Sequence, residues 1–194
     1  EKERFVTYYF NGQEENAFAG EEEVVVPSPK VDTYDKKPEM SLPKLVKEFK
    51  KRIRRDVFHF IVINFANPDM VAHTGNLEAS ILAIEAVDRY LDELARAVIE
   101  LDGVLIITAD HGNAEELLTF PTATYFYTSS AGTVNTDHSN NPVPILIVGK
   151  NMPTNFSLGK GGLADVAPTI LALMGIAKPE EMTGRNLLEI TTEK

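Results

Sequence analysis

The chain has 194 residues, 43% of them hydrophobic, a formal net charge of −10 and no cysteine. This size and composition predict one domain with a sizeable core. Without cysteine, disulfides, thiolate nucleophiles and zinc–thiolate sites are excluded, so a bound metal must use histidine and carboxylate ligands. The negative charge argues against a nucleic-acid partner. No apolar run is long enough to cross a bilayer and the charged start is no secretory signal, so the sequence predicts a cytoplasmic protein without a membrane partner.

The first part of the chain predicts two strands and a helix. Aromatic and β-branched residues predict a strand over 5–10, ended by the turn pair Asn11-Gly12, and a second short strand over 23–26. Apolar residues at helical spacing after Ser41, a candidate N-cap, predict a helix over 41–54. The basic run 50–55 at its end is interpreted as a solvated helix terminus.

Strands and helices then alternate along the chain. The apolar run 57–65 predicts a buried strand, and Asn67-Pro68 starts a short helical turn. The remaining predicted elements are a long helix over 77–101, a strand over 104–109, a short helix over 114–118, a polar loop over 119–137, a strand over 143–148 and a helix over 163–174. This alternation predicts an α/β architecture with a mostly parallel sheet.

Carboxylates and histidines gather where predicted strands end. Asp69 and His73 are four residues apart, a spacing that places both on one face of a helical turn. Asp110 and His111 follow the strand 104–109 within the hexapeptide Thr108-Ala109-Asp110-His111-Gly112-Asn113, and His138 precedes the strand at 143. A single loop histidine is usually solvated or capping, but clustering at strand ends favours metal binding. His59 lies inside a strand pattern and is interpreted as a core or edge histidine.

The five donors exceed the three protein ligands of a typical catalytic zinc, which suggests two metal ions. Two divalent ions would carry four positive charges against the two negative charges of Asp69 and Asp110. The local field would then be positive and would hold an anionic phosphate. Mn²⁺, Mg²⁺, Co²⁺ and Zn²⁺ all accept such ligands, so the sequence leaves the metal open.

Short segments along nearly the whole chain point to a family. They are Glu1-Lys2, Tyr8-Tyr9-Phe10-Asn11-Gly12, Pro27-Ser28-Pro29-Lys30-Val31, Pro38-Glu39-Met40-Ser41, Asn67-Pro68-Asp69-Met70-Val71-Ala72-His73-Thr74-Gly75, Thr108 to Asn113, Asn141-Pro142-Val143-Pro144 and Glu181-Met182-Thr183-Gly184. In this order they resemble the carboxyl-terminal part of the cofactor-independent (2,3-bisphosphoglycerate-independent) phosphoglycerate mutases, which belong to the alkaline phosphatase superfamily. The resemblance implies a three-layer sandwich with helices on both faces of the sheet, present over 1–194 as a partial domain.

The resemblance also implies roles for single residues. Asp69, His73 and His138 match the ligands of one Mn²⁺, Asp110 and His111 match ligands of the second, and Lys2 matches a lysine that contacts the phosphoryl group. In the family, a metal-activated serine carries the phosphoryl group between the 3- and 2-positions of phosphoglycerate, a step of glycolysis. The full-length enzyme is expected to be monomeric.

Some parts of the family pattern do not match. The nucleophilic serine, its partner aspartate and the substrate domain lie upstream of the segment matched by Lys2, and Ser28, Ser41 and Ser80 have no matching context. We therefore expect a fragment that is inactive alone. The loop 119–137 is longer than in the family, and Gln13 stands where a second glycine is expected. The alternatives are another superfamily phosphotransferase, a phosphodiesterase or phosphopentomutase, and a metal-stabilised module without catalytic activity.

Overall fold

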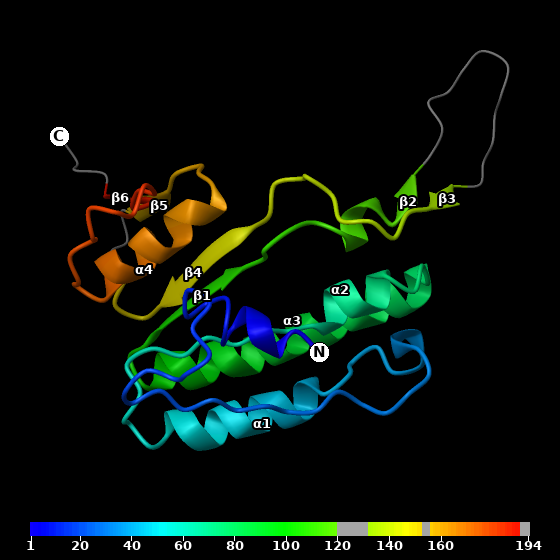
Figure 1. Cartoon of the computed structure of the whole chain (residues 1–194), viewed down its shortest axis with the longest axis horizontal. Coiled ribbons are helices and arrows are strands. Elements are labelled where there is room, and N and C mark those ends of the chain that lie inside the picture. Colours follow the sequence, from blue (N-terminus) through cyan, green and yellow to red (C-terminus); the bar gives the residue numbers. More distant parts are fainter. Residues whose placement is uncertain (120–131, 153–155, 191–194) are drawn as a thin grey trace, which may run out of the picture. The chain divides into compact units, whose positions relative to one another are not determined.

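The structure is a computed structural model that describes residues 1–119, 132–152 and 156–190 (Figure 1). The chain divides into two compact units, Glu1–Ile147 and Val148–Lys194. Most of the predicted loop 119–137 lies outside the described residues. Within the described ranges, no helix is both long and apolar enough to cross a membrane.

The described residues of the first unit contain three α-helices: α1 (Leu42–Ile53), α2 (Asn67–Ala72) and α3 (Leu77–Glu100). They confirm the predicted helices at 41–54 and 77–101 and the helical turn at 67. Helix α1 packs beside α3 (Figure 1). Val46 and Phe49 of α1 are buried against Leu94 and Val98 of α3. The Asn76 side chain caps α3 by accepting the Ala79 N–H at 3.1 Å.

Truncation of Leu94 should lower the stability of the fold strongly, because only 2% of this residue is exposed. Leu94→Ala should lower the free energy of unfolding by about 2–5 kcal/mol, because it removes buried methyl groups and leaves a cavity. Urea unfolding followed by circular dichroism measures this change. Leu82→Ala is the matched control, since Leu82 is on the same helix with 54% of its surface exposed. An equal loss in both variants would contradict this account of the core.

A second cluster joins the short helix α2 to α3. Val71 packs against Ala79 and Ala83, whose small side chains let the two helices approach closely. The buried Asn67 amide donates hydrogen bonds to the Pro38 carbonyl at 3.3 Å and to the Ala83 carbonyl at 3.1 Å. Helix α2 is therefore anchored on α3, which fixes the position of the acidic residue in its first turn.

The described strands are short and pair two by two. Strand β1 (Val104–Thr108) pairs with β4 (Ile145–Gly149), confirming the strands predicted at 104–109 and 143–148. Strand β2 (Leu118–Thr119) is antiparallel to β3 (Thr133–Val134), with Leu118 opposite Val134. In the second unit β5 (Phe156–Leu158) is antiparallel to β6 (Leu188–Ile190). Four short 3-10 helices complete the elements of the described residues: η1 (Glu3–Phe5), η2 (Tyr34–Lys36), η3 (Ala114–Glu116) and η4 (Leu163–Asp165).

The second unit contains the predicted last helix, as η4 followed by α4 (Val166–Leu173). The Asp165 carboxylate accepts the N–H of Arg185 at 2.7 Å and the N–H of Gly162 at 2.8 Å. These two hydrogen bonds hold the pKa of Asp165 below its usual value. One carboxylate thus ties the start of the helix to a segment 20 residues further along the chain.

Asp165→Asn should therefore lower the thermal unfolding temperature of the second unit, and the effect should depend on pH. A carboxylate with a lowered folded-state pKa stabilises the fold above its unfolded pKa, and that contribution is lost as the pH falls through the folded value. The difference between wild type and variant should be clear at neutral pH and shrink in strong acid. Thermal unfolding at both pH values tests this, with the exposed Asp88→Asn as control. A difference that is the same in acid would contradict the prediction.

Two of the predicted strands, at 5–10 and 23–26, were wrong. Residues 3–5 form η1, and the chain continues in turns in which the Tyr9 N–H donates to the Arg4 carbonyl at 2.9 Å. The aromatic rings of Phe5 and Tyr9 contact each other, with 5.7 Å between their centroids. These aromatic residues, which suggested a strand, therefore pack locally instead of pairing with another strand. Gln13, where a second glycine was expected, has a left-handed backbone with a φ of 70°.

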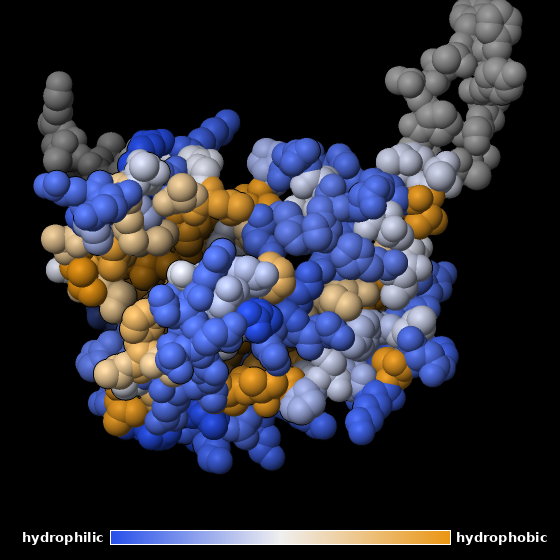
Figure 2. All heavy atoms as spheres, viewed as in Figure 1, coloured by the Kyte–Doolittle hydropathy of each residue, from blue (hydrophilic) through white to orange (hydrophobic). Residues whose placement is uncertain are grey.

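The predicted strand at 57–65 is also not a strand within the described residues. Ile63 and Phe65 pack on the main core, but the segment has no ladder partner there. Phe60 and Ile61 remain exposed, beside a hollow of about 560 Å³. Figure 2 shows apolar surface (orange) among the polar residues (blue) on the face in view. His59 is exposed, which contradicts a core position.

Candidate metal centre

The short helix α2 supplies two donors from consecutive turns. Asp69 lies in its first turn and His73 is its C-cap residue. The His73 Nε2 atom lies 3.2 Å from Asp69 Oδ1, as the spacing of four residues predicts.

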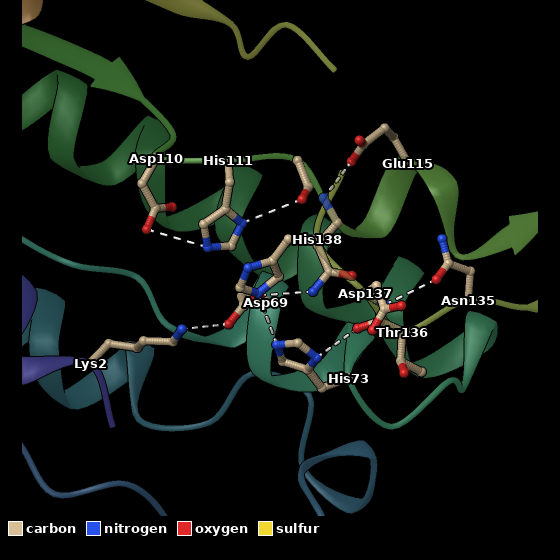
Figure 3. Close-up of polar contacts among 12 residues, drawn as sticks. Lys2, Asp69, His73, Asp110, His111, Glu115, Asn135, Thr136, Asp137 and His138 are labelled. Carbon is tan, nitrogen blue, oxygen red and sulfur yellow. Dashed lines mark hydrogen bonds and ion pairs between the residues drawn. The ribbon is translucent and has the colours of Figure 1, made fainter. Parts of the chain in front are cut away.

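His138 brings a third donor from a distant part of the sequence. Its Nε2 atom lies 3.0 Å from Asp69 Oδ1 and 3.1 Å from His73 Nε2 (Figure 3). The three donor atoms lie within 4.8 Å of one another. Two imidazole nitrogens that face each other beside a carboxylate need a proton or a cation between them, and this donor set suits a divalent metal.

A backbone contact fixes which nitrogen of His73 faces the cluster. The Thr136 carbonyl lies 2.8 Å from His73 Nδ1. Because a carbonyl can only accept, Nδ1 carries the proton and Nε2 presents its lone pair toward Asp69 and His138. Histidine ligands of metals usually have such a partner on the other nitrogen.

Asp110 and His111 lie beside this cluster but form a separate pair. They follow β1, and His111 Nε2 is 3.4 Å from Asp110 Oδ2. The His111 ring stacks on His138, with 3.6 Å between ring centroids and an interplanar angle of 18°. The Asp110 side chain is 55% exposed. The structure thus brings all five predicted donors into one neighbourhood, as a group of three and an adjacent group of two.

Lys2 contacts the same carboxylate from the amino-terminal segment. Its Nζ lies 2.8 Å from Asp69 Oδ2, and only 18% and 15% of the two side chains are exposed. Lys2 has a left-handed backbone with a φ of 60°, a strained conformation for a residue with a side chain. Such strain is found at functional sites more often than elsewhere.

The environment keeps Asp69 ionised. Burial raises the pKa of Asp69, but the Lys2 ammonium and a hydrogen bond from Asn113 outweigh burial and hold the pKa below its usual value. The Asn113 amide donates to Asp69 Oδ1 at 2.8 Å. An ionised carboxylate with little exposure is suited to bind a cation.

Sequence reasoning missed a set of polar residues next to the donors. Asn113 was quoted in the hexapeptide but given no role, although its place beside Asp110 and His111 could have indicated one. Glu115, Ser139 and Asn141 form hydrogen bonds to one another and to the turn around Asn113. Nothing in their spacing marks them, because the contacts join segments more than 20 residues apart.

Comparison with known proteins places the chain in a family. The family model described as Metalloenzyme superfamily matches residues 1–178. The chain belongs to the metalloenzyme superfamily. Membership agrees with the cluster of Asp69, His73 and His138 and implies a divalent metal cofactor.

Relatives within the superfamily are long proteins of which this chain matches one part. The chain is 48% identical over 188 residues to a 2,3-bisphosphoglycerate-independent phosphoglycerate mutase of Clostridioides difficile, covering 97% of this chain and 35% of the relative. It is 46% identical over 188 residues to the corresponding enzyme 1 of Methanosarcina acetivorans, covering 97% of this chain and 34% of that relative. The chain therefore spans about a third of these relatives, and the resemblance inferred from the short segments is confirmed.

A solved structure shows the same fold. Leishmania mexicana phosphoglycerate mutase, crystallised at low cobalt concentration, matches with a TM-score of 0.87 and 32% identity, over 98% of this chain and 36% of that chain. The fold class is therefore an alkaline phosphatase-like α/β metalloenzyme, present as a partial domain.

Proposed function

We propose that this chain provides the metal centre of a 2,3-bisphosphoglycerate-independent phosphoglycerate mutase, an isomerase that interconverts 3- and 2-phosphoglycerate through a phosphoserine. The observation that carries the proposal is the convergence of Asp69, His73 and His138 beside Asp110 and His111. The mutases that match nearly the whole chain support it. The proposal includes the glycolytic role, a cytoplasmic location and a monomeric full-length enzyme.

The proposed centre holds two divalent ions, with Mn²⁺ preferred over Mg²⁺, Co²⁺ and Zn²⁺. Asp69, His73 and His138 would hold the first ion, and Asp110 and His111 would contribute to the second. The ions, when bound, would neutralise phosphoryl charge and activate a hydroxyl group.

In the proposed centre, Lys2 lies where the phosphoryl group would bind beside the first ion. Its ammonium lies against Asp69 and would contact a phosphoryl oxygen there. With two ions contributing +4, Lys2 adding +1, and Asp69 and Asp110 contributing −2, the net local charge is +3. A surplus of positive charge in a partly buried site would bind a phosphoryl group and stabilise charge that develops during its transfer.

Four serine hydroxyls in the described part of the chain already form hydrogen bonds with other groups. Ser41 donates to the Pro27 carbonyl at 2.7 Å, and Ser80 donates to the Asn76 carbonyl at 2.8 Å. The Ser28 hydroxyl accepts a hydrogen bond from the Glu1 nitrogen at 2.9 Å, and the Ser139 hydroxyl donates one to Glu115. We therefore propose that the serine nucleophile is supplied by polypeptide outside this chain, in keeping with its share of the relatives' length.

Lys2→Met should tighten Mn²⁺ binding to the chain rather than weaken it. The substitution removes a positive charge that lies 2.8 Å from Asp69. The dissociation constant should fall by about 3–10-fold, since a nearby like charge repels the ion. Isothermal titration measures this, with the exposed Lys30→Met as control. Weaker binding in Lys2→Met would mean that Lys2 is needed to hold Asp69 in place, contrary to the proposed role.

A chimera tests the proposed function directly. The upstream part of the Clostridioides difficile mutase, joined to these 194 residues, should convert 3-phosphoglycerate to 2-phosphoglycerate without added 2,3-bisphosphoglycerate. Chelation should abolish this turnover, and Mn²⁺ should restore it. A folded, Mn²⁺-loaded chimera that leaves 3-phosphoglycerate unchanged, while the parent mutase is active, would contradict the proposal.

A further inference from the structure

We propose that Glu115 is a positioning residue that sets the metal affinity of the centre. It ties the segment carrying Asp110 and His111 to the segment carrying His138. This inference rests on the proposed metal centre. The Glu115 carboxylate contacts Asn113 and Ser139, which flank the donors in the sequence.

Glu115 accepts hydrogen bonds from both segments at once. Its Oε2 accepts the Asn113 backbone N–H at 2.8 Å. Its Oε1 accepts the Ser139 hydroxyl and the Asn141 amide, the latter at 3.1 Å. Both carboxylate oxygens are thereby used, one on each segment, which is a geometry that a neutral or shorter side chain cannot reproduce.

The backbone reinforces this connection at Gly112. The Ser139 N–H donates to the Gly112 carbonyl at 2.8 Å, and the two residues form an isolated antiparallel bridge. A Cβ on Gly112 would overlap the Glu115 carboxylate and the Ser139 hydroxyl. Glycine at this position therefore allows the close approach of the two segments.

The residues that Glu115 holds are neighbours of three donors. Asn113, whose N–H it accepts, donates its own side-chain amide to Asp69 at 2.8 Å. Ser139 follows His138, and the His138 ring stacks on His111. Ser139 and Asn113 are both buried, with 9% and 5% exposed. Loss of Glu115 would leave these polar groups without their partner and free the imidazoles to move apart.

The test is Mn²⁺ affinity, measured by isothermal titration well below the unfolding temperature of each variant. Glu115→Ala should weaken Mn²⁺ binding by about 10–100-fold, the usual effect of losing a group that orients metal ligands. Ser139→Ala, a smaller change, should weaken binding in the same direction but less. Combining Ser139→Ala with Glu115→Ala should add little beyond Glu115→Ala, because both remove the same connection. Glu85→Gln on the exposed face of α3 is the charge control and should bind like wild type.

The outcomes distinguish failure of the positioning role of Glu115 from failure of the proposed metal centre itself. If the wild-type chain binds no Mn²⁺, the proposed centre fails and this inference with it. If wild type binds but folded Glu115→Ala binds equally well, the positioning role alone is overturned, even if the unfolding temperature falls. Should Glu115→Ala not fold, Ser139→Ala decides in the same way: weaker binding supports the role, and unchanged binding overturns it.

Discussion

Replacing Asp69 by asparagine is expected to weaken Mn²⁺ binding to the chain by about 100-fold or more, because a lost ligand should exceed the 10–100-fold effect of a residue that only orients ligands. Asp69 contacts Lys2, His73 and His138, so its charge is the common element of the cluster. His73→Ala should have an effect of similar size. Isothermal titration of each purified variant with Mn²⁺ measures the change.

The matched control for Asp69→Asn is Asp137→Asn. Asp137 is exposed and lies outside the three-donor cluster, but the substitution removes the same charge next to His138. Its Mn²⁺ affinity should stay within a few-fold of wild type, since an exposed charge is screened. Equal losses in the two variants would show that net charge, rather than coordination by Asp69, governs binding.

Added alone to 3-phosphoglycerate and Mn²⁺, the 194-residue chain is expected to give no detectable 2-phosphoglycerate. Covalent transfer needs an activated nucleophile, and without it the rate enhancement of about 10⁶-fold or more that enzymes provide is lost. Among the described residues, Ser41, Ser80 and Ser139 have hydroxyls that donate to other partners. An assay coupled to consumption of 2-phosphoglycerate measures turnover.

The matching control for this assay is the chimera with the upstream part of the Clostridioides difficile relative. It should regain turnover at the same Mn²⁺ concentration, because it restores the proposed nucleophile to an unchanged metal centre. Mn²⁺-dependent turnover by the isolated chain would show that the nucleophile lies within these 194 residues.

The helices and the donor pattern could be predicted because both depend on local spacing. Apolar residues three and four apart identified α1 and α3, and the spacing of Asp69 and His73 placed both on one face of α2. The approach of His138 could not be derived from spacing. It followed from the family resemblance and from the tendency of functional side chains to gather at strand ends.

The strands predicted at 5–10, 23–26 and 57–65 failed for a physical reason. A strand is stabilised by its partners, so an aromatic or apolar run is a strand only where another strand lies beside it. Phe5 and Tyr9 instead contact each other, and 57–65 has no ladder partner within the described part of the chain. The contact of Lys2 with Asp69 and the hydrogen bonds of Glu115 could not be predicted from local spacing either, since they join distant segments.

Diffraction from crystals of the chain grown with Mn²⁺, measured on both sides of the manganese absorption edge, would locate the metal ion held by the three-donor cluster. We expect an anomalous peak bounded by Asp69, the Nε2 atom of His73 and the Nε2 atom of His138, where the three donors lie within 4.8 Å of one another. Full Mn²⁺ loading of the crystals with no peak at these three side chains would contradict this expectation.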